Sequence, residues 1–315
     1  MAIKKKDKIV VIGAGNVGET IAYTLMIREL ANEIVLIDLN EKRAKGSALD
    51  IAHGTAFYDQ ITVRAGGYEE CADASIIIIS AGVGRKPGQT RLELAQTNVS
   101  IAKSIARSIM EYAENPLLIV VSNPVDVLTM AIQKETGLPS NRVIGTGTSL
   151  DTARLRYLIG RECGVSISDV IAYVLGEHGD SQVPLWSRVR LGGISLKGFT
   201  DQLNINIDYD ALAAEAKDSG AEIIAEKGAT YNGVAMATSR IVEAIVKNEH
   251  AVLAVSHVLG DEFGEWAGIS MSVPCIVNAQ GIEKCVNINM EDNEREALNR
   301  SAQTLREFWN NLNLD

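Results

Sequence analysis

Cysteine is scarce in this sequence, and the positions of the cysteines argue against both disulfide bonds and a metal site. The four cysteines (Cys71, Cys163, Cys275 and Cys285) are scattered, and no CxxC pair occurs. No cysteine or histidine stands at the spacing typical of a metal site, so we expect no metal. We therefore expect free thiols in a reducing cytoplasm.

Positive charge and long apolar runs are also lacking. Lys and Arg number 30 against 40 Asp and Glu, a net charge of −10, so no basic surplus exists to neutralise the phosphates of a nucleic acid. No apolar stretch reaches membrane-spanning length, and the N-terminal lysines are not ordered as in a signal peptide. We expect neither nucleic acid nor a membrane as a partner. The composition, 46% apolar and 22% charged, is that of an ordinary globular protein.

The first half alternates apolar, strand-like runs with helical patterns. The four isoleucines of 76–79 form an unbroken apolar run, as buried parallel strands do. A repeated strand–helix pattern predicts a parallel sheet with right-handed crossovers. We expect a Rossmann doubly wound α/β domain over residues 1–148, with strands at 9–12, 34–37, 61–64, 76–80, 117–122 and 143–145.

After about Thr148 the pattern changes, which predicts an α+β substrate domain over residues 149–315. The absence of a linker indicates that the two domains pack closely. Helices are expected at 150–164, 208–227, 232–248 and 291–312, and β-rich segments at 170–175, 188–191, 252–258, 269–277 and 281–286.

A Gly-rich motif predicts a dinucleotide site. Gly13, Gly15 and Gly18 form G-x-G-x-x-G between a strand and a helix, where the backbone can approach a pyrophosphate at the helix N-terminus. Asp38 follows twenty residues later, where a carboxylate can bind ribose hydroxyls and repel a 2′-phosphate. NAD is favoured over NADP, although Arg43 lies close by. The alternatives are a turn without a ligand and phosphate binding without redox chemistry.

The segment 176–181, Gly-Glu-His-Gly-Asp-Ser, predicts a proton-transfer site. His178 there lies between glycines and carboxylates, directly after an apolar run. Asp151 and Arg154 share a helix face, so the aspartate can orient an imidazole and the arginine can hold a carboxylate. The alternative is a surface ion pair of little energetic value.

The loop 81–91 carries three glycines and three cations after the carboxyl end of a strand, where open α/β sheets bind ligands. It suits a lid that closes over an anion and expels water. The alternative is a solvated basic loop.

Six segments taken together resemble the L-lactate and malate dehydrogenase family over nearly the whole chain. The style of the 89–92, 148–151 and 176–178 segments is that of bacterial L-lactate dehydrogenases. The segments are 13–18, 85–91, 122–126, 145–148, 150–156 and 176–181.

The resemblance implies roles by position. His178 would donate a proton to the substrate carbonyl, with Asp151 as its orienting partner. Arg154 would clamp the substrate carboxylate, and Arg91 on the lid would polarise the carbonyl. Asn123 would contact both substrate and cofactor. Thr230 would line the substrate pocket, and NAD contacts would include Gly13, Gly15, Val17, Gly18, Asp38, Tyr68, Gly82, Val83, Ser122, Asn123 and Thr146.

Arg85 departs from the lactate pattern. Related lactate enzymes usually carry Gln at this position and malate enzymes Arg, which pairs with the second carboxylate of oxaloacetate. We therefore expect an NAD-dependent L-2-hydroxy-acid dehydrogenase that favours oxaloacetate and malate. Thr230, the lactate-type residue, favours the alternative of an ordinary pyruvate-reducing enzyme in which Arg85 points away. A catalytically retired structural protein is a remote alternative.

The resemblance also bears on assembly and regulation. It implies a homotetramer. Many bacterial relatives are activated by fructose 1,6-bisphosphate through an Arg and a His, matched here by Arg156 and Ile171. An aliphatic side chain cannot bind phosphate, so we expect weak or absent activation.

Overall fold

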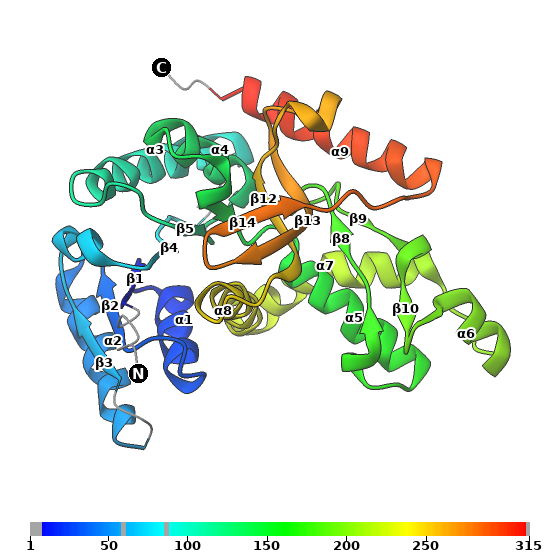
Figure 1. Cartoon of the computed structure of the whole chain (residues 1–315), viewed down its shortest axis with the longest axis horizontal. Helices are drawn as coiled ribbons and strands as arrows, with labels where there is room; N and C mark the ends of the chain where they lie inside the picture. The colour runs from blue at the N-terminus through cyan, green and yellow to red at the C-terminus, as the bar shows by residue number, and fades with distance from the viewer. Residues whose placement is uncertain (1–7, 58–60, 85–87, 313–315) are drawn as a thin grey trace.

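A nine-stranded sheet with helices on both faces forms the centre of the computed structural model, which describes residues 8–57, 61–84 and 88–312 (Figure 1). The strand order is β14-β13-β12-β6-β5-β4-β1-β2-β3. Arg85 lies outside the described residues. The strands of this sheet are β1 (Lys8–Ile12), β2 (Glu33–Ile37), β3 (Thr62–Ala65), β4 (Ile76–Ile79), β5 (Leu118–Val120), β6 (Val143–Gly145), β12 (Ala251–Val258), β13 (Ser270–Asn278) and β14 (Gly281–Cys285).

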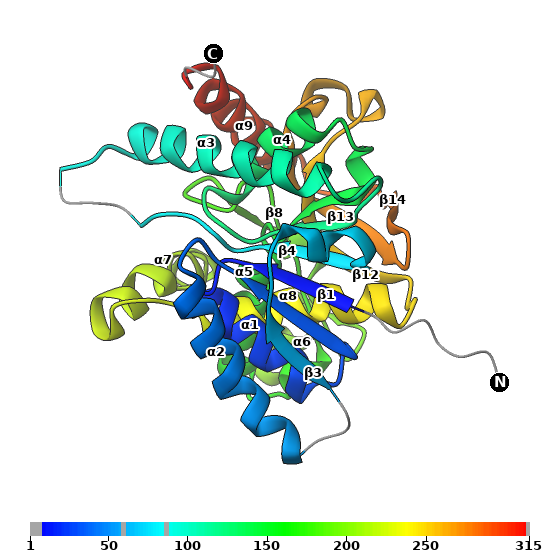
Figure 2. The same ribbon diagram turned by 90° about the vertical axis from the view of Figure 1, so that its left-hand side faces the viewer.

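The first six strands are parallel throughout, as the sequence predicts. Apart from Lys8 and Glu33, the residues of β1, β2, β4, β5 and β6 are buried and apolar, because helices cover both faces of the sheet. In Figure 2, α1 and α2 lie on one face and α3 and α4 on the other. These helices are α1 (Asn16–Ile27), α2 (Glu41–Gly54), α3 (Arg91–Met110) and α4 (Val125–Thr136). This order, β3-β2-β1-β4-β5-β6, confirms the doubly wound Rossmann fold, with its switch point between β1 and β4.

Three strands from the second half extend the same sheet in the antiparallel sense. β12 joins the edge of β6 through the pair Ser256–Gly145, and β13 and β14 follow. Helices α8 (Asn232–Val246) and α9 (Asp292–Asn310) belong to this half, and α8 packs against α1. The two halves of the chain therefore share one sheet and one apolar cluster that spans both.

The rest of the second half forms a smaller α+β lobe with its own core. Helices α5 (Ser149–Cys163), α6 (Leu196–Leu203) and α7 (Tyr209–Lys227) surround short strands there (Figure 1). No helix within the described residues is long and apolar enough to cross a membrane. The short strands are β7 (Val170–Ile171), β8 (Val174–Leu175), β9 (Val183–Pro184), β10 (Arg190–Leu191) and β11 (Ile194–Ser195), and 3-10 turns lie at Thr55–Phe57, Tyr68–Asp73, Ser140–Arg142, Ile167–Asp169, Trp186–Arg188 and Asp261–Trp266.

Candidate active site

The glycine motif forms the turn between β1 and α1, and two of its three glycines have no room for a side chain. Gly13 has a φ of +103°, and a Cβ there would lie 2.6 Å from the backbone nitrogen of Ala81. A Cβ on Gly18 would lie 1.8 Å from the Gly13 carbonyl oxygen. This contact is the close helix–strand packing that the third glycine of the motif permits. No atom lies near a Cβ built on Gly15, so that glycine leaves open space for a phosphate at the start of α1.

Asp38 lies at the end of β2 and braces the glycine turn. Its Oδ2 accepts a hydrogen bond of 2.7 Å from the N–H of Ala14, and its Oδ1 accepts one of 2.8 Å from the N–H of Asn40. The carboxylate is partly exposed beside the turn. Carboxylate and glycine turn together form a cradle with the features that NAD requires. The side chain of Arg43 is also near, at 3.5 Å from Asn16.

Asn98 holds the loops after β4 and β5 together, a role that the sequence did not reveal. The side chain is buried on α3, and its Oδ1 accepts a 2.9 Å bond from the N–H of Val83. Its amide donates to the carbonyls of Val83 and Asn123 at 3.2 and 2.9 Å. Ser122 donates its hydroxyl to the Ala81 carbonyl at 2.6 Å. These bonds bring Gly82, Val83, Ser122 and Asn123 to one end of the parallel strands.

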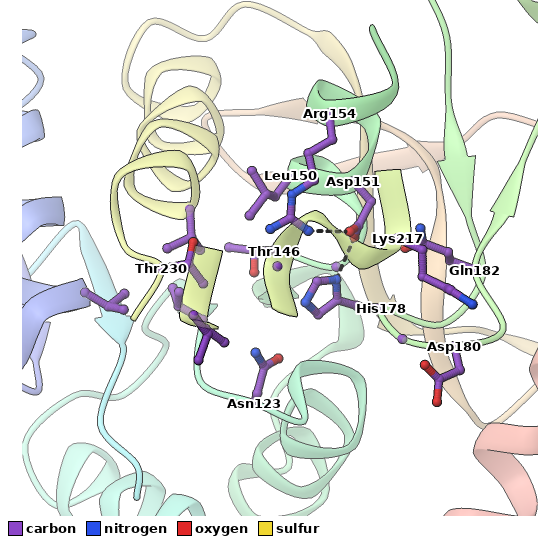
Figure 3. A pocket seen from close by; sticks show the side chains of 17 residues that line it. Asn123, Thr146, Leu150, Asp151, Arg154, His178, Asp180, Gln182, Lys217 and Thr230 are labelled. Atoms are coloured by element: carbon purple, nitrogen blue, oxygen red, sulfur yellow. Dashed lines mark hydrogen bonds and ion pairs between the residues drawn. The ribbon is translucent and has the colours of Figure 1, made fainter. Parts of the chain in front are cut away.

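His178, Asp151 and Arg154 meet in one constellation (Figure 3). The Nδ1 of His178 lies 2.6 Å from Oδ2 of Asp151, and Nη1 of Arg154 donates to Oδ1 of Asp151 at 3.2 Å. Asp151 is buried, with 2% exposure. The carboxylate therefore fixes the imidazole through Nδ1 and leaves Nε2 as its other nitrogen for exchange of a proton. The alternative of a surface ion pair is excluded for Asp151 and Arg154, because both side chains are largely buried.

A second carboxylate lies beside the histidine. The buried Asp126, on α4, accepts a 2.7 Å bond at Oδ2 from the backbone N–H of His178. Burial raises the pKa of Asp126 to about 7, although the bond from His178 opposes the shift. Burial alone would lower the pKa of His178, but the charges of Asp151 and then Asp126 outweigh it and the pKa is raised. The two aspartates therefore favour the protonated imidazole.

Arg91 lies at the rim rather than inside the pocket. It begins α3, and its Nη1 pairs with Oδ2 of Asp180 at 2.6 Å. Both side chains are exposed, and Asp180 lies among the pocket-lining residues whereas Arg91 does not. To take part in the chemistry, Arg91 would have to leave its ion pair with Asp180 and contact a bound substrate instead.

One pocket contains most of the predicted substrate residues. It brings together His178, Asp151, Arg154, Asn123 and Thr230, which come from four separate segments of the chain. Val17 and Thr146 line it from the nucleotide side, whereas Gly13, Gly15, Gly18, Asp38, Tyr68, Gly82, Val83 and Ser122 do not line it.

Further residues that were not predicted from the sequence also line the pocket. Lys217 and Gly220 on α7 reach it, as does Gln182. Lys217 adds a second cation, whose charge contributes, after the hydrogen bond from Arg91, to a lowered pKa of Asp180. No sequence signal marks Lys217, because α7 is a polar helix in which a lysine is ordinary. Asp126 could have been noticed, since a carboxylate within an apolar helical run must find a partner.

The comparisons with known proteins agree with this geometry. Residues 7–145 match the family model of the lactate/malate dehydrogenase NAD-binding domain, and residues 148–313 match its alpha/beta C-terminal domain. An L-lactate dehydrogenase of Shouchella clausii is 43% identical over 305 residues, which cover 96% of this chain and 94% of that protein. One of Acetivibrio thermocellus is 43% identical over 310 residues, 98% of each chain.

A solved structure is similar over the same length. The minor L-lactate dehydrogenase of Enterococcus mundtii, in a ligand-bound form, superposes with a TM-score of 0.94 at 41% identity and covers 98% of this chain and 99% of its own. The matched nucleotide domain and the glycine cradle make NAD the cofactor of this oxidoreductase. On these grounds the chain belongs to the lactate/malate dehydrogenase family.

Proposed function

We propose that this protein is an L-lactate dehydrogenase that interconverts pyruvate and L-lactate. The observation that carries the proposal is the His178–Asp151–Arg154 constellation, at 2.6 and 3.2 Å, in a pocket beside the nucleotide cradle. Relatives that cover nearly the whole chain bear the name L-lactate dehydrogenase, and this supports pyruvate as the substrate over the broader class of keto acids.

The chain's own residues would handle the carboxylate and the proton. Arg154 can offer two parallel N–H groups to a carboxylate, which fixes the orientation of a 2-keto acid. His178, protonated and held by Asp151, would give its Nε2 proton to the ketone oxygen and recover it in the reverse reaction. NADH held at the glycine cradle would supply the hydride to carbon 2, and NAD⁺ would accept it in the reverse reaction. Asn123 and Thr230 would contact the substrate from two different segments that line the pocket (Figure 3).

Arg91 completes the proposed site by moving. Its pair with Asp180 is exposed, so the pair is weak and can be broken at small cost. The freed guanidinium could then donate a hydrogen bond to the carbonyl oxygen of a bound substrate, and its charge would stabilise the negative charge that forms on this oxygen during reduction.

Oxaloacetate is a second candidate substrate, favoured by Arg85 and by the presence of Lys217 in the pocket. A second carboxylate needs a cation when it loses water, whereas the methyl group of pyruvate does not. We expect kcat/KM to be higher for pyruvate, and Arg85→Gln to lower the ratio of oxaloacetate to pyruvate activity. NADH oxidation with each keto acid measures both values.

Three outcomes of that assay would separate the alternatives. A pyruvate preference of about tenfold or more, equivalent to about 1.4 kcal/mol, would rule out oxaloacetate as the favoured substrate. A preference for oxaloacetate that Arg85→Gln abolishes would overturn the pyruvate proposal. No turnover of either acid by folded, NADH-binding protein would identify a retired enzyme. Arg43→Gln, a change of the same kind near the cofactor turn, serves as the control.

Asp126 provides a prediction about pH. Asp126→Asn keeps an oxygen for the N–H of His178 but removes a negative charge, so we expect the pKa of His178 to fall. Since reduction requires the protonated imidazole, kcat/KM for the keto acid should decline at a lower pH than in the wild type. A pH profile of kcat/KM measures the shift. Profiles that superimpose, with Asp201→Asn as an exposed control, would show that Asp126 does not position the proton.

The proposal also covers the oligomeric state, the cellular compartment and the response to fructose 1,6-bisphosphate. We infer a homotetramer in the cytoplasm, the latter because the described cysteines are free. Ile171 lies on β7 and is 51% exposed, so it offers an apolar surface where an activated relative would offer an imidazole. Fructose 1,6-bisphosphate should leave the KM for pyruvate unchanged in steady-state assays, and a marked drop in KM would contradict this.

A further inference from the structure

A second cluster of reactive side chains lies away from the pocket. His257 on β12, Cys275 on β13 and Cys285 on β14 each offer a donor atom, and these three atoms lie within 4.8 Å of one another. The two sulfurs are 3.6 Å apart, and Nε2 of His257 is 3.3 Å from Sγ of Cys285. The sequence shows no ligand spacing because the three residues are 10 to 28 positions apart and meet only through the sheet.

The cluster is partly closed from solvent and independent of the pocket. Cys275 is fully buried and His257 is 5% exposed, whereas Cys285 is half-buried and gives access from outside. None of the three lines the pocket. The three strands that carry them lie side by side at one end of the sheet (Figure 1).

We propose that His257, Cys275 and Cys285 form a binding site for a thiophilic divalent metal ion, of which zinc is the natural choice. Zinc takes thiolate and imidazole ligands in a tetrahedral arrangement. Two thiolates on one zinc ion lie about 3.8 Å apart, because Zn–S bonds are about 2.3 Å long at a tetrahedral angle. The observed 3.6 Å between the sulfurs is close to that value.

The imidazole of His257 would be the third of the four ligands in the tetrahedral site. A thiolate and an imidazole on one zinc ion lie about 3.6 Å apart by the same geometry, against the 3.3 Å between Nε2 and Cys285. The other ring nitrogen, Nδ1, is the one that faces Cys275, at 4.0 Å, so the ring must turn for Nε2 to share an ion with that sulfur. The half-buried Cys285 leaves room on its outer side for water as the fourth ligand.

A metal fits the cluster better than a disulfide does. A disulfide bond is about 2.05 Å long, so both thiols would have to turn towards each other and away from their present separation of 3.6 Å. The disulfide would also leave the buried imidazole without a role. A metal uses all three donors and ties β12, β13 and β14 together. Since binding would favour the folded state, the ion would raise the thermal stability of the protein.

The test uses the full chain, stripped of metal by a chelator and kept reduced with a phosphine. Co²⁺ is the probe, because a tetrahedral thiolate site gives it intense visible absorption and a sulfur-to-cobalt charge-transfer band. We expect one equivalent to bind, Zn²⁺ to displace it, and Zn²⁺ to raise the Tm. Cys285→Ser should weaken binding at least about 100-fold, more than the loss of a supporting outer residue.

Matched variants make the result decisive. Cys163→Ser removes another buried cysteine outside the cluster and should bind Co²⁺ like the wild type. His257→Gln should also weaken binding and change the spectrum. The half-buried position of Cys285 makes its serine variant the safer one for folding, which its Tm without metal verifies. Absence of thiolate-bound Co²⁺, or equal binding by Cys285→Ser, would overturn the proposal, as would an oxidant-formed Cys275–Cys285 disulfide in protein that takes up no metal when reduced.

Discussion

Replacement of His178 by asparagine should lower kcat for keto-acid reduction by about 10²- to 10⁴-fold, the range typical of a lost general acid. Asparagine can still hydrogen-bond to the buried Asp151, so the carboxylate does not become an unpartnered charge. It cannot deliver a proton at neutral pH. Binding of NADH should stay unchanged because Gly13, Gly15 and Gly18 of the nucleotide cradle do not line the pocket that holds the imidazole. Steady-state kinetics and a fluorescence titration of NADH measure the two quantities.

His250→Asn is the matched control for this prediction. His250 pairs with Glu283 at 2.6 Å on the surface, and its φ of +54° is one that asparagine adopts readily. This variant should retain wild-type kcat. A His178→Asn enzyme within about tenfold of the wild type would contradict the role of His178 as proton donor, because general acids contribute more than that.

Replacement of Arg154 by lysine should lower kcat/KM by on the order of 10²-fold, because it removes one of two parallel hydrogen bonds to the substrate carboxylate and a hydrogen bond between charged groups contributes about 1.5–3 kcal/mol. Lysine keeps the charge but offers a point contact instead of two parallel N–H groups. The guanidinium of Arg154 also lies against α7, where a Cβ on Gly220 would be 3.3 Å from Nη2. A lysine would not fill this space. Most of the loss should appear as a higher KM for pyruvate.

Arg161→Lys provides the control on the same helix. Arg161 lies on α5 and pairs on the surface with Glu162 and Glu215, so its replacement should leave KM unaltered. NADH affinity should be equal in both variants and in the wild type. A KM for Arg154→Lys within about threefold of the wild type would mean that another cation holds the carboxylate, and Lys217 would be the first to examine.

A structural feature could be predicted from the local sequence where a single segment contains all the residues that form it. The isoleucine run of β4 can only be a buried strand in a covered sheet, and the spacing of Gly13, Gly15 and Gly18 is meaningful because strand and helix flank it. The pairing of Asp151 with Arg154 also follows from their spacing on one helix.

Contacts between segments far apart in the sequence could not be predicted from local patterns. The bond from His178 to Asp126 joins residues 52 positions apart, and the bonds of Asn98 join α3 to the loops after two strands. An asparagine is ordinary in a helix, and a carboxylate in an apolar helical run indicates that Asp126 needs a partner but not which one. Their roles arise because burial forces a polar group to find a partner, and the fold decides which partner is near.

The amino-acid pattern alone is enough to assign a doubly wound nucleotide-binding sheet and membership of the lactate/malate dehydrogenase family. Only the folded chain shows that β12, β13 and β14 extend the same sheet, that a second aspartate lies beside His178, and that His257, Cys275 and Cys285 meet. The physical reason is that short-range patterns of apolarity and glycine fix strands, helices and turns. Side-chain encounters across strands depend instead on register and burial, which are set only when the whole chain packs.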